Sequence, residues 1–184
     1  MLNALLRKRP KSGAAGQKVG DALYAAVSAQ ARQPAFYTTL GVADRIDARF
    51  ELYTLHALLL ILRLRDEDAD GAGEGATAAQ SLFDVYVSAL DNVLRELGVG
   101  DISMARKMRT LGEALYGRMT AYEPAVRTGD AETLALHLAR NVYVSEDATQ
   151  AGPLARYALA ARASLAAQAF PDVLTAPSWP EISA

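Results

Sequence analysis

The sequence predicts an all-α protein, built as a single helical domain of about six to seven helices. Apolar residues recur every three or four positions through most of the 184-residue chain, which is the period of an amphipathic helix. No stretch alternates apolar and polar residues as a half-buried strand would. Hydrophobic residues make up 51% of the composition, enough for a chain of this length to bury a substantial core.

The first predicted helix covers residues 21–32 and has Asp21 at its start, where a carboxylate can accept hydrogen bonds from free backbone amides. Its apolar residues lie four apart: Leu23, Val27 and Ala31. The segment before it is rich in Lys, Gly and Ser, so we expect residues 1–20 to be flexible and outside the folded domain. A short helical turn from Pro34 follows, because proline favours the first turn of a helix; Gly41 can end it.

The most hydrophobic predicted helix spans residues 44–65. One apolar stripe consists of Phe50, Tyr53, Ala57, Leu60 and Leu64, and a second of Leu52, Leu55, Leu59 and Leu62. A helix that is apolar nearly all round must be enclosed by other helices, so we predict this one at the centre of the domain. His56 and Arg63 interrupt the apolar run, which is shorter than the roughly 20 residues of a membrane-spanning helix.

Residues 66–79 contain acids and glycines but no large apolar side chain, which is typical of an exposed, mobile loop. A second long helix is predicted over residues 79–97. Its predicted inward face consists of Leu82, Tyr86, Leu90, Val93 and Leu97. Gly98 can adopt the left-handed conformation that ends a helix, so we expect the helix to stop there.

A third long helix is predicted to begin near Ser103, and it has the most regular period in the chain. Its apolar residues step by three or four positions: Met104, Met108, Leu111, Leu115, Met119, Tyr122 and Val126. Pro124 lacks a backbone N–H, which predicts a kink or break near the end of this helix. Gly129 and Asp130 then predict a turn followed by the cap of a further helix.

That further helix continues to about Tyr143, and a last, alanine-rich helix is predicted from Gly152 to about Ala169. Three prolines follow, so residues 170–184 are predicted to form an extended tail. The chain is therefore expected to consist of the basic segment 1–20, a helical domain over residues 21–169, and this tail.

The composition excludes several classes of function. The chain has no cysteine and two histidines, which excludes disulfides and argues against a structural zinc site. The sequence contains no Glu-x-x-His motif, phosphate-binding loop, dinucleotide fingerprint or nucleophile elbow. We therefore predict a protein that is not an enzyme and has no catalytic residue, metal, cofactor or small-molecule substrate.

The charge is unevenly distributed. Residues 1–20 carry five basic residues and no acid, whereas the rest of the chain holds 14 basic and 21 acidic residues, a formal charge of −7. This distribution argues against a broad nucleic-acid-binding surface. The basic start has no long apolar core, unlike a secretory signal. It could mimic a very short organellar transit peptide, but we favour a cytoplasmic protein whose residues 1–20 contact an anionic membrane.

His56 is the suggestive titratable group of the central helix. We favour a buried histidine that makes a structural hydrogen bond. The alternative is that His56 binds haem or a quinone in an apolar pocket. That alternative needs a second ligand or an orienting partner, and the sequence supplies none nearby.

Polar and aromatic residues on the predicted helices leave two interpretations open. Arg106, Lys107, Arg109 and Arg118 give the third long helix a basic side, which is either a solvated face or a docking surface for an acidic or polar segment. Asp91 and Arg95 are spaced to pair on the second long helix. The helical tyrosines either edge the core or, with the methionines, rim an apolar groove suited to helical clients.

Three blocks of sequence occur in a distinctive order. They are Arg49–His56 (RFELYTLH), residues 82–84 leading to Asp91–Asp101 (DNVLRELGVGD), and residues 107–109 with 116–118 and 121–122. Together they resemble the ubiquinol–cytochrome c chaperone family over about residues 34–144. The stretch Leu-Arg-Glu-x-Gly-Val-Gly-Asp is the most specific element of this resemblance.

The resemblance implies an all-α assembly chaperone that binds newly made cytochrome b and supports biogenesis of the respiratory bc1 complex. In mitochondria such proteins act with a small partner protein near the ribosome exit. The short, arginine-rich form of this chain is typical of alphaproteobacterial members, so the resemblance implies a location in a bacterial cytoplasm or at the inner face of the bacterial inner membrane. A further hypothesis is a generic helical interaction module, in which the resemblance is accidental.

Nine polar residues of the three blocks are the candidate client-binding residues: Arg49, Glu51, His56, Asp91, Arg95, Asp101, Lys107, Arg118 and Tyr122. Their distribution over three helices predicts either one shared face or one buried polar network. In either case we expect the helices around residues 44–64 to leave an apolar groove that shelters a hydrophobic segment of another protein.

Overall fold

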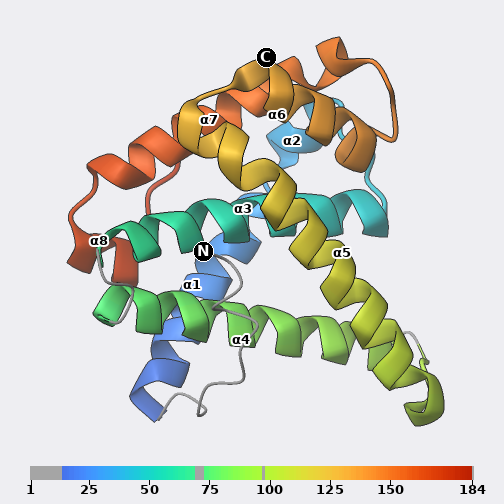
Figure 1. Ribbon diagram of the computed structural model, residues 1–184, viewed down its shortest axis with the longest axis vertical. Helices are drawn as coiled ribbons and strands as arrows, with labels where there is room; N and C mark the ends of the chain where they lie inside the picture. The colour runs from blue at the N-terminus through green and yellow to red at the C-terminus, as the bar shows by residue number, and fades with distance from the viewer. Residues whose placement is uncertain (1–13, 69–72, 97, 184) are drawn as a thin grey trace.

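The computed structural model describes residues 14–68, 73–96 and 98–183, and in these ranges it contains helices and no strand (Figure 1). Six helices have eight residues or more: α1 (Ala14–Ala31), α3 (Ile46–Asp66), α4 (Glu74–Glu96), α5 (Asp101–Thr128), α6 (Ala131–Leu138) and α7 (Gly152–Ala167). Two are shorter, α2 (Pro34–Thr38) and α8 (Phe170–Thr175). The predicted all-α fold class is confirmed.

Helix α3 lies at the centre of the molecule, as its two apolar stripes predict. Figure 1 shows α4 below it, α6 and α7 above it, and α5 crossing it diagonally. Every residue from Thr54 to Leu64 is buried. A helix apolar on all sides loses the most water-exposed area in this position, which is why the other helices assemble around it.

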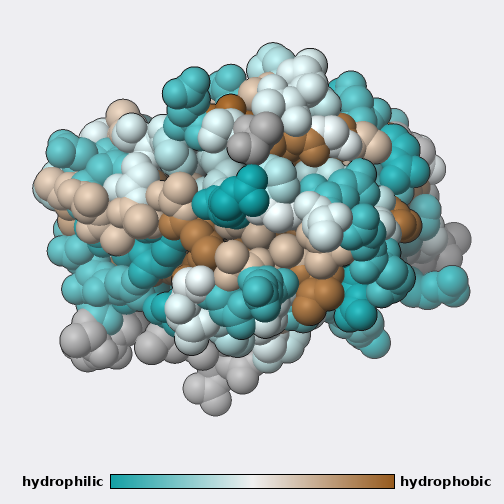
Figure 2. Space-filling view, turned by 90° about the horizontal axis from the view of Figure 1, so that it is seen from above, coloured by the Kyte–Doolittle hydropathy of each residue, from teal (hydrophilic) through white to brown (hydrophobic). Residues whose placement is uncertain are grey.

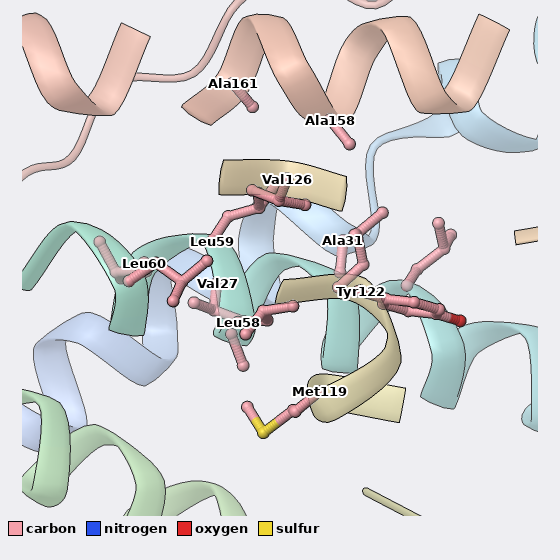
Figure 3. Packing of buried hydrophobic residues seen from close by; sticks show 14 of the residues in the cluster. Val27, Ala31, Leu58, Leu59, Leu60, Met119, Tyr122, Val126, Ala158 and Ala161 are labelled. Carbon is pink, nitrogen blue, oxygen red and sulfur yellow. The ribbon is translucent and has the colours of Figure 1, made fainter. Parts of the chain in front are cut away.

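The core around α3 is closed by apolar side chains from α5 and α7. Figure 3 shows Met119 and Tyr122 of α5 in the same cluster as Leu58 of α3, with Ala158 and Ala161 of α7 above them in the view. All five are buried. The regular period of the third predicted helix is thus its core-facing stripe, although Met108 and Leu111 are only half-buried.

Helix α1 begins at Ala14, seven residues before the predicted start, so Asp21 is not its cap. Asp21 instead accepts a hydrogen bond of 3.1 Å from the Gln17 amide within the helix. The segment before residue 21 was predicted to be flexible because it is rich in Lys, Gly and Ser. Packing explains the difference at Gly20, where an added Cβ would lie 2.7 Å from the Ser81 carbonyl oxygen. The absence of a side chain there lets α1 and α4 touch through their backbones.

Helix α4 begins at Glu74, within the segment predicted as an exposed loop. Gly75 and Ala76 are buried against the end of α3, and a Cβ on Gly75 would lie 2.1 Å from the Leu64 carbonyl oxygen. Small residues therefore mark close helix packing here rather than a loop. The other end of α4 also differs from prediction, since Leu90 is half-buried and Val93 is 46% exposed. Leu97, also predicted to face inward, lies outside the described residues.

Helix α5 begins at Asp101 and continues through Pro124 to Thr128, so the proline does not break it. Burial of Ala125 and Val126 holds the turn beyond the proline against the core. The predicted turn is confirmed: Gly129 has φ 73° and Asp130 caps α6 by accepting a hydrogen bond from the Thr133 amide. Gly98 is likewise left-handed, with φ 78°.

The C-terminal region is more ordered than predicted. Helix α6 ends at Leu138 and continues as a π-helical turn, Ala139–Tyr143. The predicted extended tail contains α8, because Pro171 lies in the first turn of a helix, where proline needs no N–H donor. Val173 of α8 is fully buried, which fixes this helix to the domain.

The close contact at Gly20 gives a direct test of this packing. We expect Gly20→Ala to destabilise the protein by about 1–3 kcal/mol, because its Cβ would overlap the Ser81 backbone. The matched control is Gly112→Ala in α5, whose Cβ would meet nothing within 4 Å. That control should stabilise by up to about 1 kcal/mol through helix propensity. Urea unfolding of both variants measures the two effects; equal effects of the two variants would contradict the packing.

Candidate functional site

An apolar groove of about 470 Å³ opens between the N-terminal half of α3 and the C-terminal half of α4. Helix α1 closes one side, and Leu111 of α5 reaches in from another. The residues that line this apolar groove are Tyr24, Arg32, Ile46, Asp47, Arg49, Phe50, Tyr53, Tyr86, Ala89, Leu90, Val93, Leu94 and Leu111. The part of α3 that is fully buried begins at Thr54. The groove lies beside the residues before it, where α3 is not covered on all sides.

Aromatic side chains form much of the groove. Tyr24 and Tyr86 stack with ring centroids 6.2 Å apart. The Tyr86 hydroxyl is buried and hydrogen-bonded to the Thr54 hydroxyl at 2.8 Å, and burial raises the pKa of Tyr86. Rings held in this way present a rigid surface to a ligand and lose little side-chain entropy on binding.

The groove opening is apolar with charged neighbours. Ile46 is 64% exposed and Val93 is 46% exposed, although both are large hydrophobic residues. The Arg32 guanidinium lies over the Tyr53 ring, 5.7 Å from its centroid. Arg49 pairs with Asp44 at 2.6 Å, and because both side chains are exposed to water this pair contributes little to stability. An apolar opening between charged groups is the arrangement expected of a site that receives an apolar segment.

A buried ion pair connects the groove wall to α5. The Arg118 Nε donates to Glu51 Oε1 at 2.5 Å, and the Glu51 side chain is 3% exposed. Burial raises the pKa of Glu51, although the adjacent Arg118 opposes this shift. The same guanidinium lies 5.7 Å from the centroid of Phe50, a groove residue.

His56 belongs to a separate network in the core. Its Nδ1 lies 2.7 Å from the Leu52 carbonyl oxygen, which can only accept, so Nδ1 carries the proton. Its Nε2, 2.9 Å from the Tyr157 hydroxyl, therefore accepts from Tyr157. The Tyr157 oxygen in turn accepts from the Gln30 amide at 2.9 Å. The rings of Phe36 and Trp179 pack edge-on against the imidazole, with their centroids 5.2 and 5.3 Å from its centroid.

This geometry does not favour the haem or quinone alternative. His56 is fully buried, and both of its ring nitrogens are hydrogen-bonded, so neither is free to bind iron. The apolar groove does not include His56. Within the described residues no three His, Asp or Glu side chains are grouped so as to hold a metal ion.

The nine candidate residues do not form one face. Arg49, Glu51 and Arg118 lie at the groove and its wall. His56 and Tyr122 are fully buried, and the Tyr122 hydroxyl accepts from Asn141 at 3.0 Å. The remaining described members are on the outside: Lys107 is exposed, and Asp91 pairs with Arg95 at 2.8 Å along α4. The side chain of Asp101 lies outside the described residues.

Sequence reasoning missed most of the groove-lining residues. Tyr24, Arg32 and Ile46 lie off the apolar stripes that defined the predicted helices. Val93 was assigned to the core because it continues the inward face of α4. The sequence held one signal of the groove: α3 and α4 have more apolar residues than the other helices can cover. The spacing of apolar residues along a helix cannot show where the neighbouring helices end.

Elsewhere the exposed apolar surface is divided. Leu136 and Val144 are 45% and 69% exposed, far along the chain from the groove residues. Figure 2 shows the molecule from above, where brown apolar patches are separated by teal hydrophilic side chains. Within the described residues no helix combines the length and hydrophobicity needed to cross a membrane.

Comparison with known proteins assigns the chain to a family. The family model described as ubiquinol–cytochrome C chaperone matches residues 38–179. The chain belongs to this family. The match extends past the predicted limit near residue 144 and includes α7 and α8. The crystal structure of the Cbp3 homolog from Brucella abortus is similar at a TM-score of 0.79 and 30% sequence identity, covering 91% of this chain and 92% of that chain. No match was found among curated proteins.

The buried imidazole predicts how stability of this chaperone-family protein depends on pH. Burial lowers the pKa of His56 from 6.5 to about 4. Between these values the unfolded chain binds a proton that the folded protein does not, so stability falls as the pH falls. From pH 7 to pH 5 the loss from this group is about 2 kcal/mol.

Urea unfolding at both pH values measures that loss. The matched variant is His56→Phe, which keeps an aromatic ring in the core but cannot titrate. It should be less stable at pH 7, because the Tyr157 hydroxyl and Leu52 carbonyl lose a partner, yet its stability should fall about 2 kcal/mol less on acidification. An identical pH dependence in both proteins would contradict a buried neutral His56.

Proposed function

We propose that this protein is a non-enzymatic assembly chaperone that holds an apolar segment of newly made cytochrome b in the apolar groove. Through this it would support biogenesis of the ubiquinol–cytochrome c reductase complex. The observation that carries the proposal is the groove itself, with large apolar residues left open to water beside charged ones. Family membership supports the role in assembly, and the family resemblance suggests cytochrome b as the client.

The size of the groove determines how a client would bind. A volume of about 470 Å³ is within the range of ordinary ligand pockets, roughly 300–1,000 Å³. A helix is about 10–12 Å across with its side chains, so the groove would take the side chains of one helix face rather than a whole helix. This is the helix-in-groove mode, in which anchors spaced three or four apart enter an apolar depression.

The chemistry of the groove suits temporary holding. Its aromatic rings bury apolar client surface that would otherwise aggregate before cytochrome b is assembled. Few groove residues are charged, so binding would rest on moderate apolar contact rather than on strong ion pairs. Since the sequence carries no nucleotide-binding motif, release would come from competition by the membrane or by the assembling complex.

Location and the remaining candidate residues are part of the same proposal. We propose that the protein acts at the inner face of a bacterial inner membrane, with the basic residues 1–20 contacting anionic lipid. Of the nine candidate residues, Arg49 is the one that lines the groove and could contact the client directly. Glu51 and Arg118 would act through the groove wall.

Charge placed at the groove opening tests this proposal. Ile46→Asp and Val93→Asp should each weaken binding of an apolar cytochrome b peptide by at least about tenfold, because a carboxylate would have to be desolvated against the client. Both positions are exposed, so stability should change by about 0.5 kcal/mol or less. Fluorescence anisotropy of the labelled peptide gives the affinity, and urea unfolding gives the stability.

The matched control is Leu136→Asp, at a position 45% exposed compared with 46% for Val93. It should bind the peptide like the unaltered protein. In a bacterial strain whose own gene is deleted, the control should restore the assembled bc1 complex and the groove variants should not. Normal assembly with both groove variants would refute the proposal. Capture of unrelated proteins in place of cytochrome b would favour a generic interaction module.

A further inference from the structure

The pair Glu51–Arg118 joins two helices at the edge of the apolar groove. Glu51 is on α3, one residue after the groove residue Phe50, and Arg118 is 67 residues further along on α5. Their contact is 2.5 Å long, and the Arg118 guanidinium also lies over the Phe50 ring. One side chain of α5 is therefore bound both to the groove wall and to the carboxylate behind it.

Burial makes this contact sensitive to the loss of either partner. Glu51 is 3% exposed, and its second oxygen, Oε2, has no hydrogen-bond partner within the described part of the chain. The positive charge of Arg118 thus compensates for the water that the buried Glu51 carboxylate has lost. Separating such a pair leaves an uncompensated charge in the protein, which is strongly unfavourable.

The pair lies about one helical turn from the point where α5 leaves the core, since Leu115, 2% exposed, is still a core residue on its N-terminal side; Met104, near the start of α5, is also buried. Beyond it toward the C-terminus, Met119, Tyr122 and Val126 are buried, and Arg127 pairs with Asp66 of α3 at 3.0 Å. On its N-terminal side, the described side chains from position 105 to 110 are exposed apart from the half-buried Met108. Leu111, which lines the groove, lies on this less covered part of α5.

Two glycines on the same part of α5 lower its stiffness. Cβ atoms added to Gly112 or Gly117 would meet nothing within 4 Å, so packing does not require glycine at either position. Each costs a helix about 1 kcal/mol relative to alanine. The helix is therefore weakest between the groove residue Leu111 and the ion pair at Arg118.

We propose that Glu51 and Arg118 are positioning residues that set the width of the apolar groove by holding the α5 wall against α3. This inference rests on the proposed function for the importance of the groove, but the position of the wall can be measured without any client. While the pair is closed, α5 keeps Leu111 at the groove. When the pair is broken, the glycine-containing part of α5 moves outward and the groove widens.

The absence of cysteine allows the wall position to be measured directly. Spin labels on Arg45→Cys and Thr110→Cys, both exposed positions, report the distance between α3 and α5 by pulsed electron paramagnetic resonance. In the otherwise unaltered full-length protein we expect one narrow distance distribution. With Glu51→Gln or Arg118→Met added, its centre should shift outward by about 5 Å, half the roughly 10 Å diameter of a helix. Circular dichroism confirms that each variant remains helical.

The control is Asp44→Asn, which removes an ion pair of similar length that does not involve α5. It should leave the distance distribution unchanged. If Arg118→Met fails to fold, Glu51→Gln decides alone, because its amide keeps the shape of the side chain. An unchanged distribution in the folded pair variants, or an equal shift in the control, would overturn the inference. Failure of a cytochrome b peptide to bind would instead count against the proposed function, and the distances measured without peptide would still decide the role of the pair.

Discussion

Helix α3 is shielded from water on every side from Thr54 to Leu64, and the other helices are arranged so as to bury it. From Thr54 to Leu64 no side chain is left exposed, because α1, α4, α5, α7 and the π-helical turn Ala139–Tyr143 all contact this one helix. Close approach requires small residues at the contacts, which explains Gly75 where α4 meets the end of α3; Gly20 has the same role where α1 meets α4. The fold is thus organised by one apolar segment rather than by pairs of amphipathic helices.

Burial of α3 also determines where its polar groups find partners. Thr54 bonds to Tyr86 of α4, His56 to Tyr157 of α7, and Glu51 to Arg118 of α5. Arg63 donates to the Leu165 carbonyl of α7. The polar side chains of the central helix therefore fix it to three neighbours, with one contact each to α4 and α5 and two to α7. Apolar contact alone would allow these helices to slide or rotate, whereas a buried hydrogen bond fixes their positions.

The helices were predictable from the sequence because period, caps and turns are local. Gly98, Gly129 and Asp130 end or begin helices as expected. The starts of α1 and α4 were not predictable, because their glycines suit either a loop or a close helix contact, and the choice depends on residues far along the chain. Glu51 and Arg118 were candidates from the resemblance, but their pairing depends on how α5 crosses α3. The groove could not be predicted, because the sequence does not show at which residue the other helices stop covering α3.

The groove lies at the N-terminal half of α3 because the neighbouring helices do not fully cover that half. Ile46 and Phe50 continue the apolar character of the helix, yet α4 and α5 diverge from it there. Full closure would bury these residues and increase stability, but it would leave no place for a client. Two ion pairs join α3 and α5: Glu51–Arg118 at the edge of the groove, and Asp66–Arg127 at the other end of α3. The first of these is the one that we propose sets the width of the open region. Under the proposed function, a groove that stays open and binds with moderate strength lets the membrane or the assembling complex compete for the client.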